Sequence, residues 1–226
     1  MPRWSPMESQ RRKRHMSIPV ELIAWEECER LARLLAGKIR ESGFAPQAVL
    51  AIARGGVVPA RLLCDHLDIM EMACLRVAHY QAHHKSPEAK VCQSLSLDLT
   101  DQRVLLVDDV SDTGDSFEAA LAYLRAHATP REVRTCALHH KRTSTYVPDY
   151  FGGLITEWRW LTYPWAVLED LGGFIEEAGL VGASPAHIAE TLQQRHGFRP
   201  TEQQIEDALA MRARLRRTRW ALPSPG

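Results

Sequence analysis

Residues 104–116 read Val-Leu-Leu-Val-Asp-Asp-Val-Ser-Asp-Thr-Gly-Asp-Ser, and no other segment constrains the chain as strongly. Four aliphatic residues open the segment and predict a short buried strand, which the carboxylates of Asp108 and Asp109 end. A loop of small and hydroxylated residues follows, and a helix is expected from Phe117 onward. Backbone N–H groups and the positive end of a helix dipole meet in such a loop, so the pattern predicts a pocket for a phosphate dianion.

The two acids need a partner other than that phosphate. Asp108 and Asp109 would repel a phosphate unless they bind a different part of the same ligand. Hydroxyl groups donate hydrogen bonds to ionised acids, so a vicinal diol is a suitable partner. A ligand with a phosphate at one end and a diol in its middle is a ribose 5-phosphate. The alternative interpretation is an ordinary strand-to-helix turn in which a Ser or Asp side chain, such as that of Asp112, caps the helix.

The composition favours one globular core and argues against two classes of partner. The 226 residues are 45% hydrophobic, and 28 basic side chains balance 28 acidic ones. No global field therefore attracts nucleic acid or an anionic membrane. No apolar run approaches the roughly 20 residues that span a bilayer. The five cysteines are scattered and never in C-x-x-C spacing, which favours reduced thiols and a cytoplasmic location.

Apolar patterns predict that strands and helices alternate through the middle of the chain. The predicted strands are 48–53, 72–77, 103–107 and 133–139, and the predicted helices are 19–42, 57–67 and 117–127, with a polar loop over 78–98. This alternation is typical of an α/β fold with a parallel sheet and helices on both faces. Such sheets bind ligands beyond the carboxyl ends of their strands, where residues 54–56 and 108–116 fall.

The two ends of the chain differ from its middle. We expect a disordered basic tail over 1–17, a main domain over 18–180 and a helical extension over 181–226. Ser184 and Gly197 are expected to cap the first helix of the extension, and Thr201 with Gln204 forms a capping box for the second. We expect this helical hairpin to pack on the main domain or at a dimer interface. A helix-turn-helix that binds DNA is the alternative.

The 104–116 segment resembles the signature of type I phosphoribosyltransferases, which bind 5-phosphoribosyl-1-pyrophosphate (PRPP). The family pattern is four apolar residues, two acids, two spacers and then Asp/Ser-Thr-Gly-x-Ser/Thr, and the chain matches every defined position. The resemblance implies the fold of that family, a central mostly parallel sheet flanked by helices, with a hood region. Two other phosphate-binding patterns, G-x-x-x-x-G-K-[ST] and G-x-G-x-x-G, occur nowhere in the chain.

The resemblance also implies how PRPP is bound. The loop that would hold the 5-phosphate consists of Asp112, Thr113, Gly114, Asp115 and Ser116. Asp108 and Asp109 would bind the ribose hydroxyls, directly or through the waters of a Mg²⁺ ion. The turn Arg54-Gly55-Gly56 resembles the family's pyrophosphate loop, in which a guanidinium and exposed N–H groups donate to the leaving pyrophosphate.

A flexible loop is implied after Val77. In the family, this loop closes over the reacting centre and keeps water away from it. Relatives often carry Ser-Tyr at the start of the loop, where this chain carries His79 and Tyr80.

Lys141 and the segment 158–165 resemble the hood of hypoxanthine–guanine and xanthine–guanine phosphoribosyltransferases. The resemblance implies that Lys141 donates to the six-oxo group of a purine, that Trp160 stacks on the ring and that Leu161 offers backbone groups. It also places Asp112 near nitrogen 7 of the purine as a catalytic general acid/base. The alternatives are a solvated strand end for Lys141 and core packing for Trp160.

One position departs from the family pattern. Relatives carry an acid directly after the Pro-Trp pair to help bind magnesium and the base, but this chain carries Ala166 there. Glu169 and Asp170 are the candidate replacements. Without them, metal binding would rest on Asp108, Asp109 and the substrate.

Together these features predict an Mg²⁺-dependent phosphoribosyltransferase of purine salvage. It would transfer the 5-phosphoribosyl group from PRPP to hypoxanthine, guanine or xanthine, and release a nucleoside 5′-monophosphate and pyrophosphate. On family grounds a homo-oligomer, most simply a dimer, is expected. Two alternatives stay open: a PRPP-sensing regulator that binds nucleic acid through its basic termini, and an enzyme of the same fold that acts on a pyrimidine or another acceptor.

Overall fold

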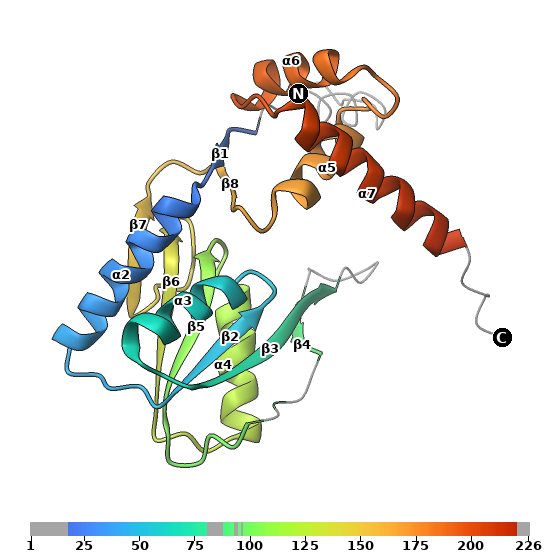
Figure 1. Ribbon diagram of the computed structural model, residues 1–226. Helices are drawn as coiled ribbons and strands as arrows, with labels where there is room; N and C mark the ends of the chain where they lie inside the picture. Colours follow the sequence, from blue (N-terminus) through green and yellow to red (C-terminus); the bar gives the residue numbers. More distant parts are fainter. Residues whose placement is uncertain (1–17, 81–87, 93–94, 96, 221–226) are drawn as a thin grey trace, which may run out of the picture. The chain divides into compact units, whose positions relative to one another are not determined.

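The computed structural model describes residues 18–80, 88–92, 95 and 97–220. The chain divides into two compact units (Figure 1). The sheet unit is Trp25–Trp158, and the helical unit comprises the described residues up to Ala24 and from Arg159 onward. The predicted tail over 1–17 lies outside the described residues.

A six-stranded sheet in the order β4-β3-β2-β5-β6-β7 forms the centre of the sheet unit. Its strands are β2 (Ala48–Ala53), β3 (Glu71–Tyr80), β4 (Glu88–Val91), β5 (Arg103–Ser111), β6 (Glu132–Lys141) and β7 (Tyr150–Ile155). All neighbouring strands are parallel except β3 and β4, which pair antiparallel. The mostly parallel α/β sheet predicted from the sequence is therefore confirmed.

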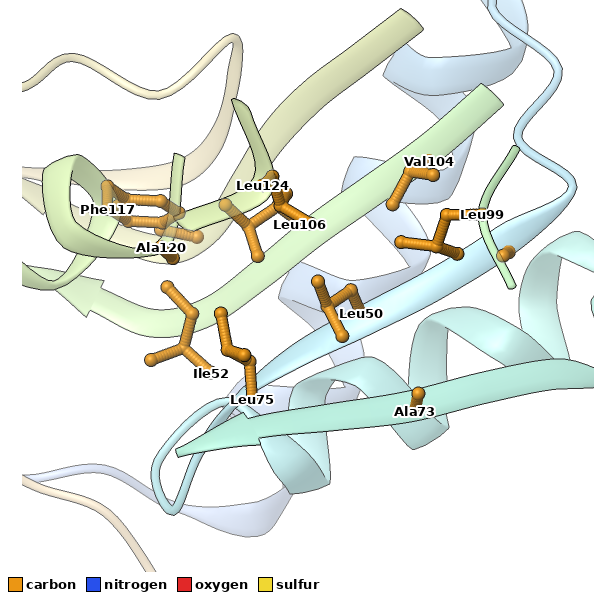
Figure 2. Packing of buried hydrophobic residues seen from close by; sticks show 12 residues of the cluster. Leu50, Ile52, Ala73, Leu75, Leu99, Val104, Leu106, Phe117, Ala120 and Leu124 are labelled. Atoms are coloured by element: carbon orange, nitrogen blue, oxygen red, sulfur yellow. The ribbon is translucent and has the colours of Figure 1, made fainter. Parts of the chain in front are cut away.

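Helices cover both faces of this sheet. α2 (Trp25–Glu41) and α3 (Val57–Leu67) contact each other on one face, and α4 (Asp115–His127) packs on the other. Alternate strand residues form a buried core with α4, as Figure 2 shows. Its members include Leu50, Ile52, Leu75, Val104, Leu106, Phe117, Ala120 and Leu124. The intervening strand residues, such as Val49 and Leu105, are equally buried, which explains the unbroken apolar runs in the sequence.

The predicted helix over 19–42 is wrong in its first residues. Val20–Leu22 form a strand, β1, which pairs in parallel with β8 (Trp160–Thr162), and α2 starts only at Trp25. The backbone groups of a strand need a partner strand, and this partner is distant in the sequence. Local periodicity therefore could not reveal it.

The predicted polar loop over 78–98 is also wrong in part. β3 continues to Tyr80, and β4 pairs with it so that His79 lies opposite Ala89 and Tyr80 opposite Glu88. The two residues expected to open a flexible loop therefore belong to a strand. β4 is an edge strand, where polar residues are common, so polarity alone was a poor guide. Residues 81–87 of the predicted loop lie outside the described residues.

The helical unit contains β1, β8 and three helices, α5 (Val167–Glu177), α6 (Pro185–His196) and α7 (Glu202–Trp220). The three helices share one buried core, which includes Phe174, Ile175, Ile188, Leu192 and Ile205. The two C-terminal helices thus pack against α5 within their own unit.

The helix caps predicted for the C-terminal helices are confirmed. The Ser184 hydroxyl accepts a hydrogen bond from the backbone N–H of His187 at 3.4 Å, and Gly197 ends α6 with a positive φ of 79°. The capping box closes in both directions. The Thr201 N–H donates to the Gln204 side chain at 2.9 Å, and the Gln204 N–H donates to the Thr201 hydroxyl at 3.2 Å.

The described residues contain no helix long and apolar enough to cross a membrane. All five cysteines are free thiols, and three of them are buried: Cys28, Cys64 and Cys136. Burial, together with the charges of Glu27 and Asp109, raises the pKa of Cys28 to about 11. This thiol is therefore protonated at neutral pH and serves as a core residue.

We expect Gly114→Ala to destabilise the protein by about 1–3 kcal/mol, because Gly114 has a φ of +103° that other residues adopt only with strain. An added Cβ would also lie 2.7 Å from Cβ of Tyr146. Thermal unfolding should show a decrease in Tm of about 2–4 °C per kcal/mol. The control is Gly37→Ala in α2, where nothing lies within 4 Å of an added Cβ and a small gain in stability is expected. Equal Tm values for the two variants would contradict this account.

Candidate active site

The turn after β2 packs directly against β5. A Cβ added at Gly55 would lie 2.5 Å from Oδ2 of Asp109, and one added at Gly56 would collide with the backbone oxygen of Val107. Only glycine fits at either position without movement of its neighbours. Arg54, which precedes them, is exposed. The structure thus brings the predicted pyrophosphate turn next to the predicted acid pair.

The acid pair lies within β5 rather than after it. β5 continues to Ser111, and its pairing with β6 places Asp108 opposite Ala137. Asp108 is buried, with 7% of its surface exposed, and its Oδ1 accepts the backbone N–H of Asp109 at 2.9 Å. Burial, and then the charge of Asp109, raises the pKa of Asp108 well above its usual range. The two carboxylates therefore resist joint ionisation, which a ligand with positive charge or hydrogen-bond donors would favour.

Residues Asp108–Phe117 line a cavity of about 460 Å³. α4 starts at Asp115 within this lining, so the N-terminus of the helix opens into the cavity. This arrangement suits an anion, because N–H groups and the positive end of the helix dipole gather there. The helix N-cap is Gly114, so the alternative that Asp112 caps the helix is wrong.

The segment after β6, residues 144–146, is hydrogen-bonded to the end of β5 and to the loop that follows it. The carbonyl oxygen of Thr113 accepts two hydrogen bonds from Thr145, one from the backbone N–H at 3.0 Å and one from the hydroxyl at 2.8 Å. The Ser111 hydroxyl lies 2.8 Å from the hydroxyl of Ser144 and donates to the carbonyl oxygen of Tyr146. These hydrogen bonds hold the loop against residues 144–146.

Asp112 and Lys141 form an ion pair. Nζ of Lys141 donates to Oδ2 of Asp112 at 2.7 Å, and the Lys141 side chain is only 2% exposed. The alternative of a solvated strand end for Lys141 is therefore wrong. Trp158 completes the cluster, since its Nε1 donates to Oδ1 of Asp112 at 3.1 Å. The two residues predicted to act on the base are thus brought together.

The other two predicted base-binding residues belong to the helical unit. Trp160 and Leu161 lie in β8, where Trp160 is 39% exposed and Leu161 is buried. Oδ2 of Asp170 accepts Nε1 of Trp160 at 2.8 Å and the hydroxyl of Thr162 at 2.9 Å. Burial raises the pKa of Asp170, whereas these two hydrogen bonds oppose that shift. Asp170 therefore anchors β8, and a role as magnesium ligand would compete with these bonds.

Sequence reasoning missed two features of this site. Trp158 was part of the predicted hood, but Trp160 and Leu161 were the residues of that segment that were assigned a role. The support from residues 144–146 was not foreseen at all. Two tryptophans that alternate with other residues near a strand were a signal that both should be considered. Contacts with a loop thirty residues earlier carry no such signal.

Among the residues that the structure describes, no group of three or more His, Cys, Asp or Glu side chains could hold a metal ion. Asp108 and Asp109 are the pair of acids next to the cavity that could bind a cation. Mg²⁺ is usually bound by one or two carboxylates together with substrate oxygens and water. The residues present are therefore compatible with magnesium, but not with a cage made by the protein alone.

Comparison with known proteins agrees with this geometry. Residues 21–167 match the model of a family described as phosphoribosyl transferase domain, which is more than half of the chain. A xanthine-guanine phosphoribosyltransferase of Nitratidesulfovibrio vulgaris is 27% identical over 143 residues, which is 63% of this chain and 82% of that protein.

Solved structures show the same relationship. A purine phosphoribosyltransferase from Pyrococcus horikoshii has a TM-score of 0.58 and 31% identity, over 66% of this chain and 94% of its own. A hypothetical protein from Neisseria gonorrhoeae, solved with bound ppGpp, has a TM-score of 0.61 and 28% identity, over 74% of this chain and 99% of its own.

We expect Asp108→Asn to raise the Tm of the free protein, because it removes a buried acid beside a like charge. Folding raises the pKa of Asp108, so the protonated side chain contributes its full stabilisation below about pH 4. This contribution to the free energy of unfolding is lost as the pH rises through the pKa of the folded protein. The Tm advantage of the variant should therefore grow between pH 4 and pH 8 in thermal unfolding. Asp65→Asn, at an exposed position on α3, is the control. A Tm difference between wild type and Asp108→Asn that stays constant with pH would contradict a raised pKa of Asp108.

Proposed function

The chain belongs to the phosphoribosyltransferase family, close to the six-oxopurine enzymes, and from this premise we propose that it uses PRPP to convert hypoxanthine, guanine or xanthine to the nucleoside 5′-monophosphate. Pyrophosphate is the second product. One observation carries the proposal: the glycine turn meets Asp109, and the same cavity continues from the acid pair to Asp112, which is paired with Lys141. Each part of the two substrates therefore has a chemically suited partner along one edge of the sheet.

PRPP is proposed to occupy the 460 Å³ cavity with its 5-phosphate at the N-terminus of α4. The backbone of residues 112–116 and the hydroxyls of Thr113 and Ser116 would donate to this phosphate. Asp108 and Asp109 would accept hydrogen bonds from the ribose hydroxyls. Arg54 and the adjacent glycine N–H groups would bind the pyrophosphate, which leaves from the anomeric carbon.

Magnesium is proposed to join the acid pair. Asp108 and Asp109 would hold the ion together with oxygens of PRPP and water. Bound there, the ion would neutralise negative charge on the acids and on the pyrophosphate. The raised pKa of Asp108 supports this role, because burial and the charge of Asp109 disfavour its ionised form, which a nearby cation would favour.

Asp112 and Lys141 are proposed to bind the base. The reaction forms a bond from the anomeric carbon to a ring nitrogen, so the purine must lose a proton overall. Asp112 would accept that proton near nitrogen 7, and the Lys141 ammonium would donate to the six-oxo group. For Trp160 and Leu161, in β8 of the helical unit, the family resemblance implies stacking and backbone hydrogen bonds to a base. A cytoplasmic location and a dimeric state stay predictions of the family resemblance.

A second candidate is a regulator that binds a guanine nucleotide without turnover. The Neisseria gonorrhoeae neighbour supports it, because that structure holds ppGpp. This candidate predicts tight nucleotide binding and no pyrophosphate release. An enzyme for pyrimidines predicts release with uracil or another acceptor, and no loss of activity when Lys141 is changed.

Incubation with PRPP, Mg²⁺ and single bases separates these functions. We expect pyrophosphate release with at least one of hypoxanthine, guanine and xanthine, and none with uracil or with PRPP alone. Release should stop when EDTA removes the magnesium. Absence of release with all three purines would remove the proposed function, and added ppGpp followed by calorimetry would then test the regulator.

Asp109→Asn and Asp112→Asn should each lower kcat at least tenfold, which corresponds to about 1.4 kcal/mol or more of barrier. Asp109 would lose charge toward the sugar and the ion, and Asp112 would lose its capacity to accept a proton. The matched control is Asp101→Asn, which changes an exposed acid just before β5, at the opposite end of that strand. Rates near wild type in both site variants would show that the reaction occurs elsewhere.

A further inference from the structure

Three side chains of the sheet unit form a closed set of contacts. The Asp112 carboxylate accepts Nζ of Lys141 on Oδ2 at 2.7 Å and Nε1 of Trp158 on Oδ1 at 3.1 Å. The Lys141 ammonium also lies 4.7 Å from the centroid of the Trp158 ring. The three residues come from the loop before α4, the end of β6 and the segment after β7.

The two donors restrict the Asp112 carboxylate more than one donor would. The last torsion of an aspartate side chain is broad, so a carboxylate with a single donor can rotate. Donors on both oxygens fix its plane, and each oxygen keeps a further lone-pair direction for a ligand. An indole N–H can only donate, so the bond from Trp158 requires Oδ1 to act as an acceptor.

Trp158 also affects the surroundings of Lys141. The lysine side chain is only 2% exposed, although a lysine ammonium is strongly hydrated when free. The ring of Trp158 supplies a negative π face in place of part of that water, an interaction of about 0.5–2 kcal/mol. Trp158 itself is 41% exposed, so the contact with Asp112 and Lys141 is not a by-product of deep burial.

We propose that Trp158 is a positioning residue, which fixes the carboxylate plane of Asp112 and covers Lys141 before the base binds. The proposal rests on the proposed function, in which Asp112 and Lys141 contact the purine. Fixing both groups in advance lowers the entropy lost when the base is aligned with the sugar. Trp158 acts through Asp112 and needs no contact with the substrate.

The hydrogen bond from Trp158 to Asp112 can be tested without measuring turnover. In ¹⁵N-labelled free protein, the indole signal that disappears in Trp158→Phe belongs to Trp158. Its N–H should exchange with water at least fivefold faster in Asp112→Ala, while the other indole signals keep their rates. Asp112→Ala leaves the buried Lys141 ammonium without its carboxylate. If this prevents folding, the exchange rate is measured in the double variant Asp112→Ala/Lys141→Met instead. A smaller change in exchange would overturn the proposal.

A double-mutant cycle tests the effect on catalysis. Trp158→Phe keeps an aromatic face over Lys141 and removes the N–H, whereas Trp158→Leu removes both. We expect kcat/KM for the base to fall about fivefold in Trp158→Phe and further in Trp158→Leu, with KM for PRPP changed less than twofold. Tyr123→Phe, which removes a hydroxyl from an aromatic ring in the second half of α4, should leave both constants unchanged.

The background variant separates a positioning role from a general structural role. In Asp112→Ala, the further change Trp158→Phe should lower kcat/KM less than twofold, because the carboxylate that accepts the indole N–H is already absent. A loss above twofold in that background, or below twofold in the wild-type background, would overturn the proposal. If no purine supports turnover, the proposed function fails, but the exchange experiment still decides whether Trp158 holds Asp112.

Discussion

The parallel pairing of β5 with β2 on one side and β6 on the other is the constraint on which the site depends. Parallel strands end at the same edge of a sheet, so segments far apart in sequence meet there. β2 pairs with β5 only as far as Ala51 opposite Val107, whereas β6 stays paired as far as Ser111 opposite His140. β5 therefore extends beyond β2, and the glycine turn after β2 occupies the space beside Asp109. A side chain at Gly55 would displace the acid.

The ion pair between Lys141 and Asp112 is better explained by recognition than by stability. Burial of an ammonium is unfavourable unless it is paired and hydrogen-bonded, and apolar residues of similar volume often stabilise a fold equally well or better. This pair links the end of β6 to the loop before α4, and that loop lines the cavity. In the proposed function, its charge and donors would serve a flat, carbonyl-bearing base.

Local patterns predicted the parts of the fold that local interactions determine. β2 and α3 have the predicted bounds, because an unbroken apolar run is followed by two glycines and then by helical periodicity. The caps of α6 and α7 also formed as expected, since capping involves residues three or four apart. These features need no knowledge of distant segments.

The missed features depend on pairing partners and contacts that the periodicity of one segment does not reveal. β1 exists because β8 pairs with it, and β4 because β3 continues far enough to receive it. The acid pair was expected after the strand, but the long pairing between β5 and β6 includes it. Trp158 has no local pattern that distinguishes it from Trp160, and only its contacts with Asp112 and Lys141 do so. Sequence therefore predicted which residues are chemically suited to the site, and the tertiary contacts determine which of them act together.

The site also contains an unfavourable arrangement that the rest of the sheet unit must tolerate. Asp108 is buried beside Asp109, and its pKa is raised because ionisation would place two negative charges together in a region shielded from water. The apolar strand residues on both faces of the sheet stabilise the fold enough to hold it in place. A ligand that supplies positive charge or hydroxyl donors to this pair favours the ionised form of Asp108. Binding of such a ligand is therefore linked to release of a proton, and its affinity increases as the pH rises toward the raised pKa.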